Sequence, residues 1–167
     1  NSLDRKKQQA YLEKLSYRDM LTGLYNRNRY IERLEAYKQV QDQQIGAIYI
    51  DLNGLKKVND EQGHRAGDEL IVRAAGTIAG IFAEDAYRVG GDEFVVILLD
   101  VSREEFARKT EQLRRQMQEN SVDASIGGVW QASTENLENL LRRADENMYR
   151  EKKRYYSQAD AARKPES

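Results

Sequence analysis

Apolar residues recur every three or four positions in four stretches of the chain, and this spacing predicts four amphipathic helices. The stretches cover residues 30–40, 68–82, 102–117 and 137–148. A shorter helix is predicted over residues 55–62, where Gly63 follows as a residue that tolerates a left-handed backbone. Residues 64–67 are expected to connect this short helix to the next one.

Residues that cap helix N-termini stand before or at the start of three of these stretches. Asn26 or Asn28 is expected to cap the first helix, and Ser133 or Thr134 the last. Ser102, with a glutamate three residues later, forms a capping box for the helix that follows it.

Four apolar or β-rich runs predict strands over residues 45–50, 86–89, 94–99 and 122–130. The second and third runs flank Gly90-Gly91-Asp92-Glu93, which predicts a hairpin with a turn that glycine permits. Taken in chain order, the elements predict an α+β or mixed α/β fold in which helices pack on a central sheet.

The two ends of the chain are polar. The first fifteen residues permit a helix that fits either a solvated extension or a short coiled-coil stalk. Their few apolar side chains are Leu3, Tyr11, Leu12 and Leu15. At the other end, the tail from Ser157, with the single Pro165, is expected to fray.

We therefore divide the chain into a connecting helix over residues 1–17, one folded domain over residues 18–156 and a polar tail over residues 157–167. The chain begins with Asn1 rather than methionine. We expect it to belong to a longer protein with an upstream sensor domain.

Composition limits the classes of function. A length of 167 residues suits one domain with a core and is too small for two. The net charge of -1 provides no general basic field for nucleic acid. The longest apolar run, residues 94–99, is far shorter than the roughly 20 residues of a membrane-spanning helix.

The absence of cysteine excludes disulfides and thiolate metal sites. We expect a cytoplasmic domain without membrane contact, whereas a membrane anchor could lie upstream.

Three carboxylates stand where apolar runs end: Asp51 after the first predicted strand, and Asp92 and Glu93 at the tip of the predicted hairpin. If that strand lies beside the hairpin, the three converge, and converging carboxylates repel one another unless a hard cation lies between them. Mg²⁺ takes such oxygen ligands and keeps positions open for substrate phosphates. The pattern favours phosphoryl or nucleotidyl transfer, although each acid taken alone is more often a solvated turn residue.

The run Arg88-Val89-Gly90-Gly91-Asp92-Glu93-Phe94 resembles the signature loop of the GGDEF domain, the catalytic domain of diguanylate cyclases. Five further segments resemble other motifs of that family and occur in the same order. They are residues 19–27, 51–60, 63–68, 125–127 and 144–152. The resemblance therefore extends over nearly the whole chain, whereas one short loop could be an ordinary hairpin turn.

The resemblance implies a palm-like sheet flanked by helices, as in the nucleotidyl-cyclase-like GGDEF fold. It implies that two GTP molecules condense into cyclic di-GMP with release of two pyrophosphates, across a homodimer that turnover requires. By this analogy Asp51, the Leu52 carbonyl, Asp92 and Glu93 hold two Mg²⁺ or Mn²⁺ ions per active site. Glu93 is expected to be a metal ligand, and Asp92 a ligand or a general base.

The resemblance also implies a set of substrate contacts. Asn59 and Asp68 are expected to bind guanine, because a carboxylate can accept both donors of the guanine edge; Asp68 also fits the cap of a helix. Lys56 and Lys152 are candidate triphosphate contacts, and Lys56 is assigned to catalysis as well, because an ammonium meets charge on leaving pyrophosphate. Leu55, where the family usually has Phe, is expected to contact substrate.

Several positions depart from the family pattern. Ile81 and Glu84 stand where many members carry an R-x-x-D product-inhibition motif, so we expect weak or no feedback inhibition by that route. Asn53 replaces a common acid of the metal segment without removing an expected ligand. Tyr155-Tyr156 replaces a Gly-Arg pair, which is expected to remove one phosphate contact and raise the GTP requirement.

The leading interpretation is a diguanylate cyclase that acts as the output domain of a bacterial signalling protein. A second class stays open, namely a catalytically silent GGDEF-like module that binds GTP or mediates dimerisation, although such relatives usually lose the signature acids. Asp68 disfavours an enzyme that makes another cyclic dinucleotide. A template-dependent polymerase is disfavoured because no extended basic groove for nucleic acid is apparent.

Overall fold

The computed structural model describes residues 1–163, without the side chains of residues 14, 15 and 163. The Leu15 side chain and Pro165 therefore lie outside the described part of the chain.

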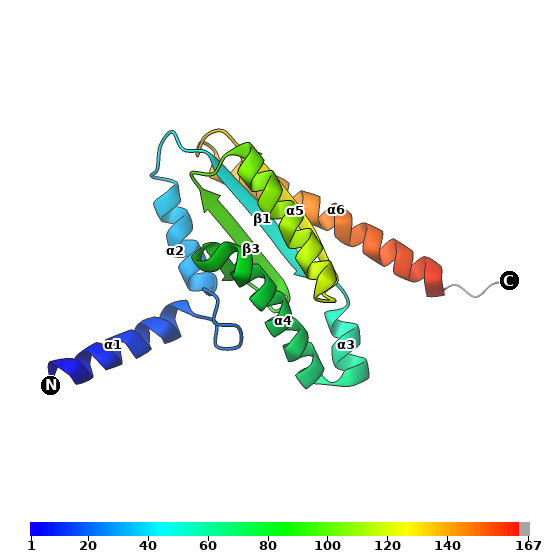
Figure 1. Cartoon of the computed structure of the whole chain (residues 1–167), viewed down its shortest axis with the longest axis horizontal. Coiled ribbons are helices and arrows are strands. Elements are labelled where there is room, and N and C mark those ends of the chain that lie inside the picture. Colours follow the sequence, from blue (N-terminus) through cyan, green and yellow to red (C-terminus); the bar gives the residue numbers. More distant parts are fainter. Residues whose placement is uncertain (164–167) are drawn as a thin grey trace.

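Four strands form one antiparallel sheet at the centre of the fold (Figure 1). They are β1 (Ile45–Leu52), β2 (Ala86–Arg88), β3 (Glu93–Leu99) and β4 (Ala124–Gln131), in the spatial order β2-β3-β1-β4. Each corresponds to a predicted strand, with ends shifted by no more than two residues. The prediction of a mixed α/β fold around a central sheet is confirmed.

Helices cover both faces of this sheet (Figure 1). Side chains of α4 (His64–Phe82) and α5 (Arg103–Glu119) pack in one core, and those of α2 (Arg27–Tyr37) and α6 (Leu137–Arg163) in the other. Because successive side chains of a strand point to opposite faces, β1 supplies both cores. Its residues Ile48, Ile50 and Leu52 enter the first core, and Ile45 and Ala47 the second.

Helix α4 begins at His64, so the prediction of a connection over residues 64–67 is wrong. Only Gly63 separates α4 from α3 (Leu55–Gln62), and its φ of 91° is a conformation that glycine adopts without steric cost. The two helices therefore form a tight hairpin. Asp68 lies inside α4 rather than at its N-terminus, which also excludes the cap suggested for it.

Two of the predicted caps are present. Asn26 Oδ1 accepts a hydrogen bond from the backbone N–H three residues later at 3.1 Å, and α2 begins directly after it. Ser102 Oγ accepts the equivalent bond at the start of α5, also at 3.1 Å.

The predicted cap of the last helix is wrong. The Thr134 hydroxyl donates instead to the Val40 carbonyl at 2.6 Å, which ties the loop before α6 to the end of the α2 region. Asn136 is the residue whose side chain accepts from a backbone N–H three positions later, at 3.4 Å.

Helix α6 continues to Arg163, so the prediction that the chain frays from Ser157 is also wrong for residues 157–163. At the opposite end, α1 (Ser2–Tyr17) projects from the domain (Figure 1). Leu3, Tyr11 and Leu12 on it are 58%, 62% and 62% exposed. Both interpretations of this segment, extension or stalk, remain compatible with such a helix.

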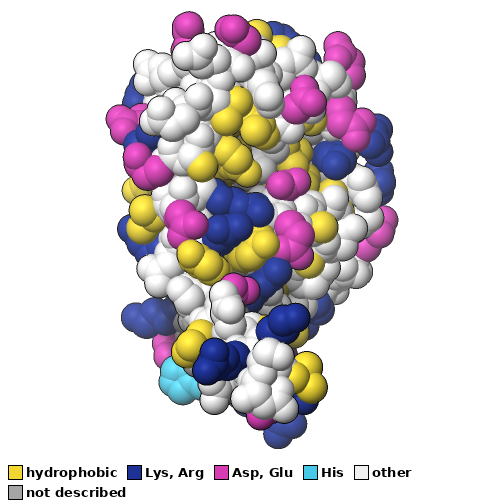
Figure 2. Space-filling model, turned by 90° about the vertical axis from the view of Figure 1, so that its left-hand side faces the viewer, with side chains coloured by type: hydrophobic (Ala, Val, Ile, Leu, Met, Phe, Trp, Pro, Cys, Tyr) yellow, Lys and Arg dark blue, Asp and Glu magenta, His cyan; other side chains and the backbone are white. Residues whose placement is uncertain are grey.

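The surface fits the balanced charge of the chain. Figure 2 shows Lys and Arg side chains interspersed with Asp and Glu over the face that it presents. Within residues 1–163, no helix combines the length and the apolar character needed to cross a membrane.

Candidate metal and nucleotide site

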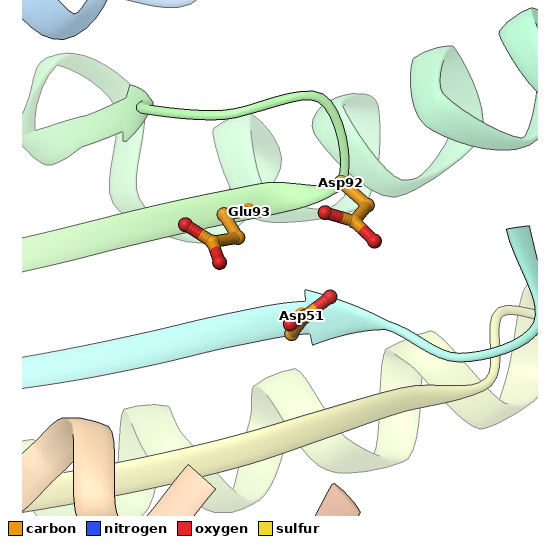
Figure 3. Close-up of side chains that lie close together, drawn as sticks. All are labelled: Asp51, Asp92 and Glu93. Carbon is orange, nitrogen blue, oxygen red and sulfur yellow. The ribbon is translucent and has the colours of Figure 1, made fainter. Parts of the chain in front are cut away.

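The three carboxylates singled out in the sequence meet at one end of the sheet (Figure 3). Strands β1 and β3 pair so that Asp51 lies opposite Glu93, and Asp92 precedes Glu93 in the turn from β2. One oxygen from each carboxylate lies within 4.8 Å of the others. The spacing is short enough for one cation to contact all three.

Backbone hydrogen bonds fix the turn that carries these acids. The Leu52 N–H donates to the Asp92 carbonyl at 3.0 Å, which extends the β1–β3 pairing past the end of β3. The N–H groups of Val89 and Gly90 both donate to the Glu93 carbonyl, at 3.0 and 3.3 Å. Neither Gly90 nor Gly91 has a left-handed backbone. The turn therefore does not use the positive φ that glycine permits.

An ion pair ties the turn to the segment at the start of the domain. Arg88 Nη1 lies 3.1 Å from both carboxylate oxygens of Asp19, and Arg88 Nη2 donates to the Gly91 carbonyl at 2.8 Å. Arg88 is thus a positioning residue for the turn. It links two segments that the sequence presents as separate motifs.

Asp51 is the most buried of the three acids, with a side chain that is 9% exposed. Burial raises the pKa of its carboxyl to about 6, the Lys152 ammonium acts against this, and the charges of Asp92 and Glu93 raise the pKa further. Lys152 Nζ lies 2.9 Å from Asp51 Oδ1, yet this buried oxygen receives no well-directed hydrogen bond from any residue of the described chain.

These features fit a divalent cation. The donor set consists of carboxylate oxygens, the type of ligand that Mg²⁺ and Mn²⁺ prefer. A buried carboxylate oxygen without a hydrogen-bond donor is stabilised by a cation nearby. The Leu52 carbonyl, the backbone ligand that the resemblance implies, already accepts from a cationic group, Lys152 Nζ, at 3.3 Å.

Asn53 has a structural role that the sequence did not reveal. Its side chain is buried, donates to Asp123 Oδ1 at 2.9 Å and accepts from the Ser125 hydroxyl at 2.8 Å. Its backbone N–H donates to the Asp123 carbonyl at 2.9 Å. These bonds hold the end of β1 against β4 and thereby fix the position of Leu52.

A pocket of about 400 Å³ opens beside the carboxylates. Its lining comes from the turn after β1, from α3, from the signature turn and from the last part of α6. The residues are Leu52, Gly54, Leu55, Lys56, Lys57, Asp60, Glu61, Asp92, Tyr155, Tyr156, Ala159 and Asp160. Leu55 and Lys56, both predicted to contact substrate, thus share one pocket with Asp92.

Tyr155 and Tyr156, expected only to replace a phosphate contact, line this pocket. They reach it because α6 continues past Lys152, and a side chain on Gly54 would meet the Tyr155 hydroxyl at 2.9 Å. The signal was present in the sequence, because Lys152, Tyr155, Tyr156 and Ala159 follow the helical spacing of three and four residues.

The two residues expected to bind guanine lie on the hairpin of α3 and α4 and do not line this pocket. Asn59 packs against Gly67, where an added Cβ would lie 1.8 Å from the Asn59 Oδ1 atom. Asp68 follows Gly67 in α4 and is exposed. The hairpin therefore brings Asn59 close to the residue next to Asp68.

The comparison with protein families agrees with the resemblance of the sequence motifs. The family described as "Diguanylate cyclase, GGDEF domain" matches residues 16–158. The chain belongs to the GGDEF domain family.

Diguanylate cyclase DgcS of Shewanella oneidensis is 33% identical over 147 residues, which cover 80% of this chain and 49% of that protein. Probable diguanylate cyclase DgcJ of Escherichia coli is 35% identical over 141 residues, 78% of this chain and 28% of that protein. The chain thus spans less than half the length of these GGDEF relatives.

A solved structure shares the fold of this GGDEF domain. The coiled coil and GGDEF domain of DgcB from Caulobacter crescentus, in complex with c-di-GMP, superposes with a TM-score of 0.78 at 23% identity. The match covers 91% of this chain and 90% of that one.

Proposed function

We propose that this GGDEF domain is a diguanylate cyclase that condenses two GTP molecules into cyclic di-GMP. The observation that carries the proposal is the convergence of Asp51, Asp92 and Glu93 within 4.8 Å beside a pocket. The named activity of DgcS and the c-di-GMP bound to DgcB support it.

In this reaction the 3′-hydroxyl of each GTP attacks the α-phosphate of the other. Each attack forms one phosphodiester bond, breaks the bond to the β-phosphate and releases one pyrophosphate, and the hydroxyl proton leaves to a base. One domain would hold one GTP, so closing the ring requires two loaded domains that face each other. A homodimer is therefore part of the proposal.

Asp51, the Leu52 carbonyl, Asp92 and Glu93 would hold two Mg²⁺ or Mn²⁺ ions. Bound there, the ions would supply charge stabilisation for the attacking and leaving oxygens. Glu93 acts as a ligand in this assignment, and Asp92 as a ligand or as the base that removes the hydroxyl proton.

Other residues of the chain bind and orient the nucleotide. Lys56 lines the pocket beside Asp92 and would meet negative charge on the triphosphate, with Leu55 next to it. Lys152 would do the same from α6. Asn59 and Asp68 would select guanine from the α3–α4 hairpin, since a carboxylate pairs with two adjacent donors that adenine lacks.

The variants Asp92→Ala and Glu93→Ala test the assignment. Glu93→Ala removes a metal ligand and Asp92→Ala removes a ligand or the base, so formation of cyclic di-GMP from GTP and Mg²⁺ should fall by about 10²–10³-fold or more in each. The measurement is chromatographic quantification of the product. Glu111→Ala is the matched control, because Glu111 is an exposed acid on α5 that forms no ion pair with the described residues.

Retained activity in either signature variant would contradict the assignment. If the unmodified chain binds GTP but yields no product even when dimerisation is enforced, the chain is instead a catalytically silent GTP-binding module.

A further inference from the structure

The Lys152 ammonium lies where a cation of the proposed site would bind. Its Nζ atom is 2.9 Å from Asp51 Oδ1 and donates to the Leu52 carbonyl at 3.3 Å. These two oxygens are the β1 ligands of the proposed metal site. An ammonium at these two oxygens uses lone pairs that a divalent ion would need, and its positive charge opposes binding of a second cation there.

The contact is well enclosed, since the side chains of Lys152 and Asp51 are only 15% and 9% exposed. Three carboxylates share this end of the sheet, so removal of the positive charge beside Asp51 increases the repulsion that its carboxylate experiences. A cation at this position lowers the electrostatic repulsion between the three carboxylates. Without a divalent ion, the lysine supplies that charge.

The backbone that carries Lys152 is firmly placed, but its side chain has an alternative position. Gly127 of β4 packs directly against the α6 backbone, where an added Cβ would lie 2.2 Å from the Met148 nitrogen. The Lys152 ammonium also lies 5.7 Å from the centre of the Tyr156 ring, which lines the neighbouring pocket. A rotation of the long side chain toward this ring requires no movement of the helix.

We propose that Lys152 is an exchangeable counter-ion of the acidic site. Its ammonium neutralises the Asp51 carboxylate and donates to the Leu52 carbonyl while no divalent ion is bound, and a divalent ion that binds these oxygens displaces it toward the pocket lined by Tyr156. The inference rests on the proposed function only in taking these two oxygens as metal ligands. It does not require that the domain turns over GTP.

Binding of Mn²⁺ alone, without nucleotide, tests the displacement. Isothermal titration calorimetry on the whole chain should show roughly tenfold tighter Mn²⁺ binding for Lys152→Met than for the unmodified chain, because the ion no longer competes with an ammonium. Lys153→Met is the matched control. It removes the same charge one position along α6, from an exposed lysine whose Nζ lies 5.0 Å from the centre of the Tyr149 ring.

Two further measurements complete the test. Lys152→Arg keeps the charge, so its Mn²⁺ affinity should stay close to that of the unmodified chain. In the unmodified chain, the NMR signal of the Lys152 side-chain ammonium should shift when diamagnetic Mg²⁺ is added, while that of Lys153 stays in place.

Equal Mn²⁺ affinity in Lys152→Met and the unmodified chain would overturn the exchange while leaving the metal site intact. The same gain in Lys153→Met would overturn it as well, since the effect would then be one of overall charge. If none of the chains binds Mn²⁺, the exchange and the proposed metal site fail together. Cyclic di-GMP production, measured separately, decides the proposed activity.

Discussion

Asp51, Asp92 and Glu93 are close to one another because of backbone pairing. Asp51 lies opposite Glu93 in the sheet, and the Leu52 N–H reaches the Asp92 carbonyl. Sequence reasoning could anticipate this meeting, because each acid stands where a buried apolar run ends. It could not anticipate that Lys152 contacts Asp51, since that contact depends on how α6 crosses the sheet.

The ion pair of Asp19 with Arg88 leads to a prediction about the stability of the fold. Burial acts to raise the pKa of its carboxyl, but hydrogen bonds from Thr22 and the ion pair with Arg88 outweigh burial and lower the pKa below its usual 3.8. The folded state therefore holds this proton less tightly than the unfolded state. The resulting stabilisation is fully present above about pH 4 and is lost as the pH falls through the lowered pKa.

The variant Asp19→Asn should lower the free energy of unfolding by about 1–3 kcal/mol at pH 7, because it leaves Arg88 without its charge partner. The deficit should shrink as the pH falls below about 4. Urea denaturation across this pH range, with the exposed Glu111→Gln as control, measures both effects. A deficit that is constant with pH would show that the ion pair with Arg88 is not its source.

At the scale of helices and strands, the predictions made from the sequence are wrong at the start of α4 and at the end of α6. Residues 64–67 have no apolar spacing of their own, and they become helical because α4 and α3 pack into a hairpin around Gly63. Residues 157–163, predicted to belong to a polar tail, continue helix α6. Tyr155, Tyr156 and Ala159 on this part of the helix line the pocket. In both places tertiary packing decides what local composition leaves open.

The packing of α6 on β4 can be tested at Gly127. An added Cβ would lie 2.2 Å from the Met148 nitrogen and 2.4 Å from the Ala144 carbonyl oxygen, and these backbone atoms cannot rotate away. Gly127→Ala should therefore lower the free energy of unfolding by about 1–3 kcal/mol or more in urea denaturation.

Gly76→Ala is the control within the same fold. Its added methyl group meets nothing within 4 Å, and it lies inside α4, where alanine should stabilise the helix by up to about 1 kcal/mol. If Gly127→Ala were as stable as the unmodified chain, α6 would not be held to the sheet in the way described.

At the scale of the whole molecule, the fold class and the set of strands follow from the sequence, because each strand coincides with a short apolar or β-rich run between helical stretches. The pairing of two domains does not follow from the pattern of apolar and polar residues, since residues 1–163 bring one set of three carboxylates together beside one pocket. The proposed reaction joins two nucleotides held by two such domains. Its rate should therefore depend on how often two loaded domains meet.

The most direct test is to incubate the chain with GTP and Mg²⁺ at a series of protein concentrations and to identify the nucleotide product by mass spectrometry. The account predicts cyclic di-GMP and pyrophosphate in a ratio of one to two, formed at a rate that rises with about the square of protein concentration while dimers are scarce. Absence of cyclic di-GMP even under enforced dimerisation, or a rate strictly proportional to protein concentration in a chain that stays monomeric, would contradict it.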